Sequence, residues 1–535
     1  MPTLAGEIST FFVLTLLVTA IVSPLVLWRY AAAVLFGMVR QTGPTLPVPP
    51  LPPAPAAAAP AARAPVDRAA WQRTAGRRAA AAWLVAFGMC ALLLAAVETH
   101  VEGSPWAPAP FAGRASIHAM VALPVIAVTL GWTMRQGLGW TLLAFATAAT
   151  LTTLVAMVSR LAAGHGPVLP LLQVGPQWLL AAAVSLWIPL LMLAASGTAR
   201  VRGVVPIVFG GLIVFALAPF VGLQLVRALA ETALGSAAML QWPWLGSRHV
   251  WFAVLALPFG ALMVWRLQVL ARRYASKRFS DVEFLARAWW LMYCTHAASS
   301  MLAAYPDRLL GALACLCVAA ALAPAARLTF GWFGIARGAP EARTLLVLRV
   351  FGYRRRTERL LGRIAARWRY QGPVTMIAAP DVTARTIDAA DFVHWLLGRT
   401  DDSFVRSGDE LERRLAAIDR ERDPDGRHRV NEFCCTDSTW QATAVELMVR
   451  ADLILMDLRG MQGRRAGCEF ELQQLALRVA PSRVVLVVTP AADRSAIHDM
   501  LGPAAQSVGF HELPDRADVD TDGLYLKLLA AADRH

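Results

Sequence analysis

The hydrophobic pattern of the chain changes once, near residue 330. Up to that point, apolar runs long enough to form membrane-crossing helices are separated by short polar connections. From Arg343 onward, short β-branched and aliphatic runs alternate with stretches whose apolar residues recur at helical spacing. The pattern predicts a polytopic α-helical membrane bundle followed by a C-terminal α/β domain with a mainly parallel five-stranded sheet.

Nine apolar stretches qualify as spans, some of them narrowly, because a hydrocarbon core of ~30 Å needs about 20 apolar residues in a helix. They are Ile8–Trp28, Ala79–Val97, Ala115–Met134, Gly137–Ser159, Pro176–Thr198, Gly203–Val226, Val250–Trp265, Ala288–Tyr305 and Leu309–Ala326. Ala288–Tyr305 is the weakest, since it carries His296 and several hydroxyl groups. If it formed one re-entrant hairpin with Leu309–Ala326, seven spans would remain.

The chain is expected to divide into four parts. They are a first transmembrane helix in residues 1–38, a Pro/Ala-rich basic cytoplasmic loop in residues 39–78, about eight further helices in residues 79–330, and a cytoplasmic α/β domain in residues 341–535. Within the loop, Gly43–Val66 is rich in Pro and Ala, so it cannot form a hydrophobic core and has few groups for hydrogen bonds. It is interpreted as a spacer, and a docking segment for a partner is the alternative.

Basic residues alternate between the two sides of the expected bundle. Residues 29–78 and 266–287 are rich in Arg, whereas the intervening connections on the other side carry few basic residues, such as the single Arg114 and Arg160. Lys and Arg collect in cytoplasmic loops. The alternation therefore predicts a bacterial inner-membrane protein with its N-terminus outside and its C-terminal domain in the cytoplasm.

Charged groups are sparse within the expected spans, and this bears on function. Carriers and pumps keep buried charges along the translocation path, but these stretches contain no acidic or basic residue beyond His118 and His296. Each histidine is interpreted as a packed or interfacial residue rather than a proton relay. A scaffold or sensor is therefore favoured over a transporter or channel.

Overall composition changes this picture little. The chain is 57% hydrophobic and 16% charged, with a net charge of +14. Because much of the excess Arg lies in short loops beside anionic lipid headgroups, no nucleic-acid partner is expected. The seven cysteines include no CxxC pair, and Cys434 and Cys435 are adjacent in an expected strand, so no metal site is expected and the compartment of the domain is interpreted as reducing.

Five strands are expected in the C-terminal domain. They are Thr344–Phe351, Val374–Ala379, Arg429–Cys435, Asp452–Leu458 and Arg483–Thr489. Helical stretches between them imply a parallel sheet, in which ligands bind at the carboxyl ends of strands.

Two of these strand ends carry candidate ligand-binding residues. After the first strand, Gly352 is followed by Arg354 and Arg355 at the start of a helix, where backbone N–H groups and guanidinium groups could hold a phosphate. A basic cluster facing lipid is the alternative. Asp381 follows the second strand and could orient a ribose, although capping of a turn is the favoured role. Neither a dinucleotide-binding glycine pattern nor a phosphate-binding P-loop is present.

The fourth strand end has the richest set of charged residues. Asp457 and Arg459 end the strand, Arg464 and Arg465 follow in a loop, and Glu471 lies in the next helix. A carboxylate there could contact a ribose hydroxyl or stabilise an oxocarbenium cation. The alternative is an ordinary acidic helix N-terminus, which the helix dipole favours.

The run from Asp452 to Leu472 resembles a Toll/interleukin-1 receptor (TIR) domain. In that family the strand leads through a loop to a W-C-x-x-E-L signature, and Cys468–Leu472 fits C-x-x-E-L with Gly467 in place of Trp. The resemblance, over residues 345–489, implies that Glu471 is the glutamate with which TIR enzymes cleave NAD at the nicotinamide–ribose bond. The first strand lacks the family's F-I-S-Y-type start, and two helices rather than one are expected between the second and third strands.

The tail also resembles uncharacterised bacterial membrane proteins with R-W-R-Y, D-P-D-G-R and C-x-F-E-L patterns. Here these patterns are Arg367–Tyr370, Asp423–Arg427 and Cys468–Leu472. Asp423-Pro424-Asp425-Gly426 has part of the spacing of a calcium loop but lacks the remaining ligands, so it is interpreted as a turn.

The leading hypothesis is a multi-pass inner-membrane signalling or stress-response protein. Its cytoplasmic TIR-like domain would bind a nucleotide-type ligand, or cleave NAD as a substrate with Glu471, and could form homo-oligomers. The alternative is a non-enzymatic membrane-anchored interaction module, and transport or channel activity is the least favoured.

Overall fold

The structure is a computed structural model of the chain. It describes residues 4–39, 45–50, 67–102, 108–131, 134–162, 229–304, 309–349, 354–378, 404–459, 466–492, 494–514 and 521–534, together with isolated positions between 207 and 226 and between 392 and 398. The chain forms two compact units. The helical unit comprises Met1–Leu27, Ala80–Trp332 and Asp388–Leu397, and the α/β unit comprises Trp28–Ala79, Phe333–Ile387 and Gly398–His535.

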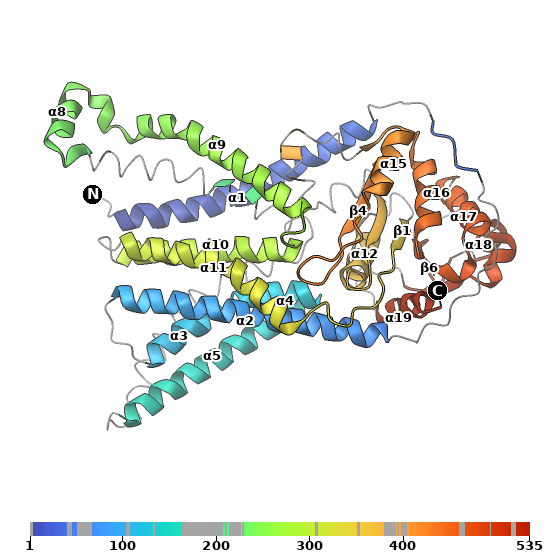
Figure 1. The fold of residues 1–535 in the computed structure, drawn as a ribbon, viewed down its shortest axis with the longest axis horizontal. Helices are drawn as coiled ribbons and strands as arrows, with labels where there is room; N and C mark the ends of the chain where they lie inside the picture. The colour runs from blue at the N-terminus through green and yellow to red at the C-terminus, as the bar shows by residue number, and fades with distance from the viewer. Residues whose placement is uncertain are drawn as a thin grey trace. The chain divides into compact units, whose positions relative to one another are not determined.

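Long helices account for most of the described N-terminal half (Figure 1). They are α1 (Leu4–Val39), α2 (Arg68–Glu102), α3 (Pro108–Ala119), α4 (Ala122–Leu130), α5 (Met134–Ala162), α8 (Ala233–Gln241), α9 (Arg248–Ala275), α10 (Asp281–Ala304) and α11 (Leu309–Phe333), with a 3-10 turn at Pro243–Gly246. Among the residues that the structure describes, four segments are long and apolar enough to cross a membrane: Arg68–Val101, Phe111–Leu130, Ala253–Ala275 and Leu310–Phe333. These helices are consistent with a membrane protein.

The remaining expected spans stay predictions. Pro176–Thr198 and most of Gly203–Val226 lie outside the described residues. The weakest stretch, Ala288–Tyr305, lies in α10 as far as Ala304, and Tyr305 is outside the described residues; α10 and α11 are separate helices of 24 and 25 residues. The expected stretch Ala115–Met134 overlaps the apolar segment Phe111–Leu130, within which a turn at Met120–Val121 divides α3 from α4.

Two helices begin earlier than the hydrophobic pattern indicates, since polar caps start them. Asp67 accepts a hydrogen bond from the Ala70 N–H at 2.8 Å, so α2 begins at Arg68 rather than near Ala79. In α10, the Ser280 hydroxyl accepts from the Glu283 N–H at 3.1 Å. Side-chain acceptors of this kind satisfy the free N–H groups of a first helical turn and extend the helix into polar sequence.

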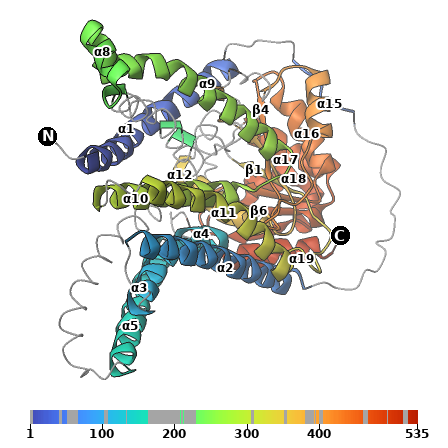
Figure 2. The same ribbon diagram turned by 60° about the vertical axis from the view of Figure 1, so that its left-hand side comes forward.

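Aromatic side chains pack α2, α10 and α11 together inside the helical unit, and the three helices run side by side in two views (Figure 2). The Trp83 ring meets Phe330 edge-on at 5.0 Å between centroids, and Phe87 meets Trp290 edge-on at 5.7 Å. The Trp290 indole N–H donates to the Val318 carbonyl at 3.1 Å. Outward aliphatic residues such as Leu257 and Leu310 are 81% exposed, as lipid-facing residues would be.

The α/β unit contains a seven-stranded sheet in which every pairing is parallel. Its strands are β1 (Leu345–Arg349), β2 (Val374–Ala378), β3 (Phe404–Val405), β4 (Val430–Cys435), β5 (Leu453–Asp457), β6 (Val484–Val488) and β7 (Gly509–Glu512), in the spatial order β3-β4-β2-β1-β5-β6-β7. The expected number of five was therefore too low. The two extra strands lie at the sheet edges, where β3 has only two residues and β7 (GFHE) lacks a β-branched run.

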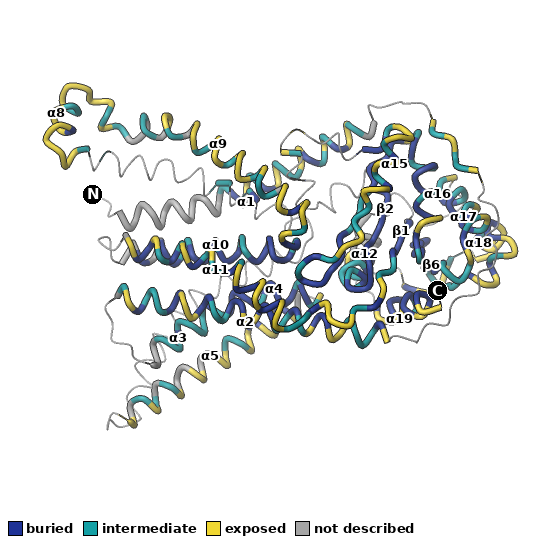
Figure 3. Tube along the Cα trace, viewed as in Figure 1, coloured by how far each residue is buried: buried dark blue, intermediate teal, exposed yellow. Residues whose placement is uncertain are grey.

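Helices cover both faces of the sheet, and β1, β5 and β6 at its centre are buried, whereas the edge strand β7 is not (Figure 3). They are α12 (Arg354–Trp368), α15 (Gly408–Ala416), α16 (Trp440–Arg450), α17 (Ala466–Arg478), α18 (Arg494–Leu501) and α19 (Asp522–Ala532), with 3-10 turns at Pro481–Arg483 and Gly502–Gln506. One core joins the sheet to α12 and α19, and the other joins it to α15 through α18. Because successive strand residues point to opposite faces, Leu345 and Val347 enter the first core and Leu346 and Leu348 the second.

The start of α2 is built into the α/β unit. The Arg68 guanidinium pairs with Asp533 at 2.9 Å, and the fully buried Gln371 amide donates to the Arg68 carbonyl at 2.9 Å. The Arg422 guanidinium stacks on the Trp71 ring at 4.9 Å. Part of the expected loop is therefore helix packed against the α/β sheet unit.

Residues 45–50, within the segment interpreted as a spacer, also contact this unit. The Leu46 N–H donates to the Ser438 carbonyl at 2.9 Å, and the Leu46 side chain packs against the core that includes α16 and α17. The two terminal nitrogens of Arg478 donate to the carbonyls of Pro49 and Pro50, at 2.7 and 3.1 Å. Carbonyls of a proline-rich segment have no internal partner, and Arg478 supplies one.

Candidate functional site

The strand order creates a topological switch point between β1 and β5. From β1 the chain moves outward on one side to β2 and β4, and then returns to place β5 on the other side of β1. Without the short edge strand β3, this is the 3-2-1-4-5-6 order of doubly wound sheets, whose ligands bind outside the carboxyl ends of the strands at the switch. Of the strand ends expected to carry candidate residues, those of β1 and β5 therefore lie side by side at the switch point.

Asp457 and Arg459 meet at this switch point. Asp457 is the last residue of β5 and lies beside Arg349, the last residue of β1, in the strand register. The Arg459 Nε and Nη2 atoms donate to the two carboxylate oxygens of Asp457, each at 2.9 Å, and the Arg459 backbone N–H donates to Oδ1 at 3.2 Å. Asp457 is 1% exposed and Arg459 is 4% exposed.

The local sequence explains this pairing. Residues two apart in an extended chain point to the same side, so D-L-R places the carboxylate and guanidinium together. Between them, the Leu458 N–H donates to the Val487 carbonyl of β6 at 2.8 Å, which holds the chain extended past the end of β5. Of the pair's donors, Arg459 Nη1 is buried without a hydrogen-bond partner among the described residues. A buried cationic donor of this kind is suited to an anionic or carbonyl oxygen.

Glu471 lies on the inner face of α17. It is 2% exposed and shares this face with Cys468, Leu472 and Leu475, which belong to the core between α17 and the sheet. The C-x-x-E-L motif therefore places its glutamate in the interior of the unit and not on its surface. The α17 helix begins at Ala466, shortly after the Asp457–Arg459 pair in the chain.

A tryptophan from α16 lies beside the motif although Gly467 stands where the TIR signature often has Trp. The Trp440 ring approaches to 3.8 Å the point where a side chain on Gly467 would begin, and it meets Phe470 edge-on at 5.4 Å. A glycine therefore leaves room for an indole that is supplied from another helix. No pattern around Gly467 in the sequence indicated this contact.

Hydroxyl groups at the end of β4 were not identified from the sequence as site candidates. Thr439 is fully buried, and its hydroxyl donates to the Val405 carbonyl and accepts from the Thr436 N–H, at 2.8 and 3.1 Å. These bonds join the end of β4 to β3. Burial raises the pKa of the neighbouring Cys435 to about 12, so this thiol is a poor nucleophile at neutral pH.

The other candidate residues are only partly described. Arg354 and Arg355 begin α12, so a helix N-terminus does follow β1 as expected, but their side chains are outside the described part. Gly352, Asp381, Arg464 and Arg465 lie outside the described residues. Of the candidate site residues, the structure brings together Asp457 and Arg459.

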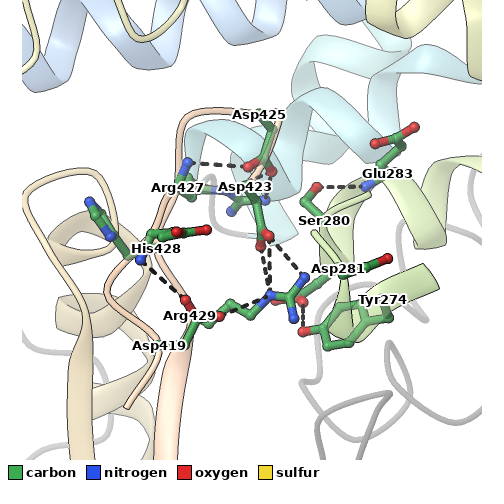
Figure 4. Close-up of polar contacts among 12 residues, drawn as sticks. Tyr274, Ser280, Asp281, Glu283, Asp419, Asp423, Asp425, Arg427, His428 and Arg429 are labelled. Carbon is green, nitrogen blue, oxygen red and sulfur yellow. Dashed lines mark hydrogen bonds and ion pairs between the residues drawn. The ribbon is translucent and has the colours of Figure 1, made fainter. Parts of the chain in front are cut away.

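The D-P-D-G-R segment forms a turn, as interpreted from its sequence (Figure 4). The Gly426 N–H donates to the Asp423 carbonyl at 2.9 Å, and Gly426 has a positive φ of 82°. Both aspartates are buried in ion pairs, Asp425 with Arg427 at 2.9 Å and Asp423 with Arg429 at 2.9 Å. Within the described ranges, no group of three His, Cys, Asp or Glu residues could hold a metal ion.

The R-W-R-Y and D-P-D-G-R patterns lie next to each other. The His428 N–H donates to the Arg369 carbonyl at 2.6 Å, and the Arg369 Nε donates back to the His428 carbonyl at 2.5 Å. The adjacent Tyr370 is 2% exposed, and burial raises its pKa to about 12. The two patterns thus form one structural element at the amino-terminal ends of β2 and β4, away from the switch point.

Comparison with known proteins gives no relative: no family model, no curated protein and no solved structure matches the chain.

Proposed function

We propose that the chain is a multi-pass inner-membrane signalling or stress-response protein whose cytoplasmic α/β unit binds a nucleotide-type ligand at the switch point between β1 and β5. The observation that carries the proposal is the buried Asp457–Arg459 pair at that point, with one guanidinium nitrogen left for a ligand oxygen. The start of α12 after β1 adds backbone N–H donors that favour a phosphate. The orientation with the N-terminus outside rests on the basic residues of the loops.

Attachment of the α/β unit to its neighbouring chain segments supports a signalling role. The start of α2 and residues 45–50 are both bonded into the unit rather than linked to it by a slack tether. A displacement of the start of α2 would therefore be transmitted to the sheet. This arrangement suits a sensor better than a freely swinging domain.

A sharper form of the proposal is NAD cleavage with Glu471 as the catalytic carboxylate. It rests on the C-x-x-E-L resemblance and on the start of α17 at Ala466, shortly after Arg459 in the chain. The full-length protein in lipid nanodiscs, at high concentration, should release nicotinamide from NAD. Glu471→Gln should reduce the rate at least ~100-fold, as loss of a catalytic acid–base group does. Glu469→Gln, two residues away on the same helix, should stay within about threefold.

Binding and cleavage separate cleanly in this experiment. A ligand present at 100 times its dissociation constant stabilises the folded unit by about 2.7 kcal/mol, so NAD or ADP-ribose should raise its thermal midpoint even in the Glu471→Gln variant. Stabilisation without nicotinamide release would reject cleavage and retain binding. If no adenine or pyridine nucleotide stabilises the unit and no nicotinamide is released, both binding and cleavage are rejected.

A second candidate is a non-enzymatic interaction module that assembles with itself. The contact of residues 45–50 supports it, because Leu46 packs against the core that includes α16 and α17, and Arg478 of α17 donates to the carbonyls of Pro49 and Pro50. Binding of the same segment from another copy would link two chains. Such assembly would be revealed by sedimentation of the full-length protein in nanodiscs, which would separate discs that hold two copies from discs that hold one. Strictly monomeric behaviour at all concentrations would exclude it.

A further inference from the structure

Three polar side chains from three helices meet inside the helical unit. His118 of α3 stands between Glu98 of α2 and Tyr293 of α10. Its Nε2 atom lies 3.0 Å from the Glu98 Oε2 atom, and its Nδ1 atom lies 2.8 Å from the Tyr293 hydroxyl. The His118 and Tyr293 rings also meet nearly edge-on, with centroids 5.5 Å apart.

The cluster is enclosed by the helices that form it. The His118 side chain is 8% exposed, the Glu98 side chain is 18% exposed, and Tyr293 is 4% exposed. The hydrophobic pattern ended the second span at Val97 and left Glu98 outside it, but α2 continues to Glu102. A carboxylate and an imidazole are thus placed together inside a helical bundle, where ionisable groups are costly to bury and are retained for function.

The two bonds of His118 define where its hydrogens belong. If the imidazole is neutral with hydrogen on Nε2, it donates to the Glu98 carboxylate while Nδ1 accepts from the Tyr293 O–H, and both bonds are satisfied. Addition of one proton to Nδ1 gives an imidazolium beside the carboxylate. The Nδ1–H must then donate to the Tyr293 oxygen, and the tyrosine hydrogen must turn to another acceptor. One proton therefore reverses the direction of the bond between α3 and α10.

We propose that Glu98, His118 and Tyr293 form a proton-binding site that couples protonation of the helical unit to the packing of α3 between α2 and α10. Its ligand is the proton itself, and the site goes beyond the nucleotide binding proposed for the α/β unit and does not depend on it. In the proposed orientation, Glu98 lies near the outer end of α2. The site then responds to the pH outside the cytoplasm.

The surrounding titratable groups are few. Glu98 interacts electrostatically with Arg114, which donates to the Thr99 hydroxyl at 3.5 Å, and with His296. Cys294 and Cys315 are the other titratable groups that sense its charge. The helix α5, which packs on α3, has only Arg135 and Arg160 as charged residues, and α4 has none. Glu98 is therefore the one acidic group in direct contact with His118 among the described residues.

Thermal unfolding of the full-length protein in nanodiscs between pH 5 and 8, where imidazoles titrate, tests the proposal. The difference in thermal midpoint between wild type and His118→Gln should change with pH. Glu98→Gln removes the charge that balances the added proton, so the transition should move at least one unit lower, a tenfold weaker affinity for the proton. The control is His100→Gln, since His100 is an exposed histidine on α2, the helix that carries Glu98. The difference in thermal midpoint between this variant and wild type should show no pH-dependent transition of this kind.

A direct measurement on the wild-type protein tests the proposal even where a variant fails to fold. With ring-¹⁵N histidine in the wild-type protein, His118 should show one protonated and one bare nitrogen at pH 8 and two protonated nitrogens at pH 5. Tyr293→Phe keeps the ring contact and identifies the His118 signals by shifting them. A His118 pattern that is the same at pH 5 and pH 8, or a flat wild-type minus His118→Gln difference, would show a packed histidine that takes up no proton and would overturn the proposal.

Discussion

Replacement of Arg459 by methionine should strongly destabilise the α/β unit. The substitution preserves most of the side-chain volume but removes both 2.9 Å guanidinium bonds to Asp457. The carboxylate, only 1% exposed, would keep a single bond from the Arg459 backbone N–H at 3.2 Å. Breaking a buried ion pair while one charge remains costs about 3–5 kcal/mol. The unfolding equilibrium of this unit should therefore shift by about two to four orders of magnitude.

Pulse proteolysis of the full-length protein in nanodiscs across a urea series would measure this change, because urea unfolds the α/β unit and proteolysis reports the unfolded fraction. The control is Arg450→Met, which removes the exposed Arg450–Glu446 pair on α16 and should cost less than about 1 kcal/mol. The double variant Asp457→Leu with Arg459→Met should recover much of the loss, since no charge is stranded. A cost below about 1 kcal/mol for Arg459→Met, or additive costs in the double variant, would refute the buried pair as the organising contact of the site.

Three further predictions follow from the same unit. Arg478→Ala should release residues 45–50, seen as faster hydrogen exchange or cleavage there, whereas unchanged protection would assign no holding role to the two carbonyl bonds. Gly426→Ala should cost more stability than Gly502→Ala. Both positions have a positive φ, which costs a residue with a side chain about 1–2 kcal/mol, but only at Gly426 would the new methyl group lie 2.6 Å from another side chain. Equal losses of stability in the two variants would contradict this. Burial and then the nearby Lys527 charge lower the pKa of His511, so the unfolded chain binds the proton more readily. His511 should therefore make the α/β unit less stable as the pH drops below about 6.5, and His511→Gln should remove this contribution. Urea midpoints at pH 5 and 8 measure it, and an equal change with pH in both proteins would contradict the prediction.

Much of the candidate site follows from local rules. The spacing of Asp457 and Arg459 on an extended strand was enough to place both side chains on one side, and the structure shows them bonded. The turn at Asp423–Gly426 also follows from its Pro and Gly. The helix starts at Asp67 and Ser280 were missed, although both caps are short-range signals that a hydrophobicity pattern overlooks.

Contacts between segments far apart in the sequence could not be predicted from such local rules. Trp440 beside Gly467 joins two helices across a strand, and Leu46 reaches Ser438 from almost 400 positions earlier in the chain. The expected five strands became seven because β3 and β7 are held by pairing with β4 and β6 rather than by their own composition. Strand propensity is weak where packing against a neighbour decides the conformation.

The sequence by itself determined that this protein has an apolar helical half and an α/β half, because hydrophobic periodicity is a local property that each segment carries alone. It also located the five central strands to within two residues at either end. Only the tertiary structure decided that β1 and β5 are neighbours, which makes Asp457 and Arg459 a switch-point pair, and that Glu98 and Tyr293 lie on either side of His118. The physical reason is the same in both cases: strand order and helix contacts depend on how separate segments bury their surfaces against one another, and no single segment contains that information.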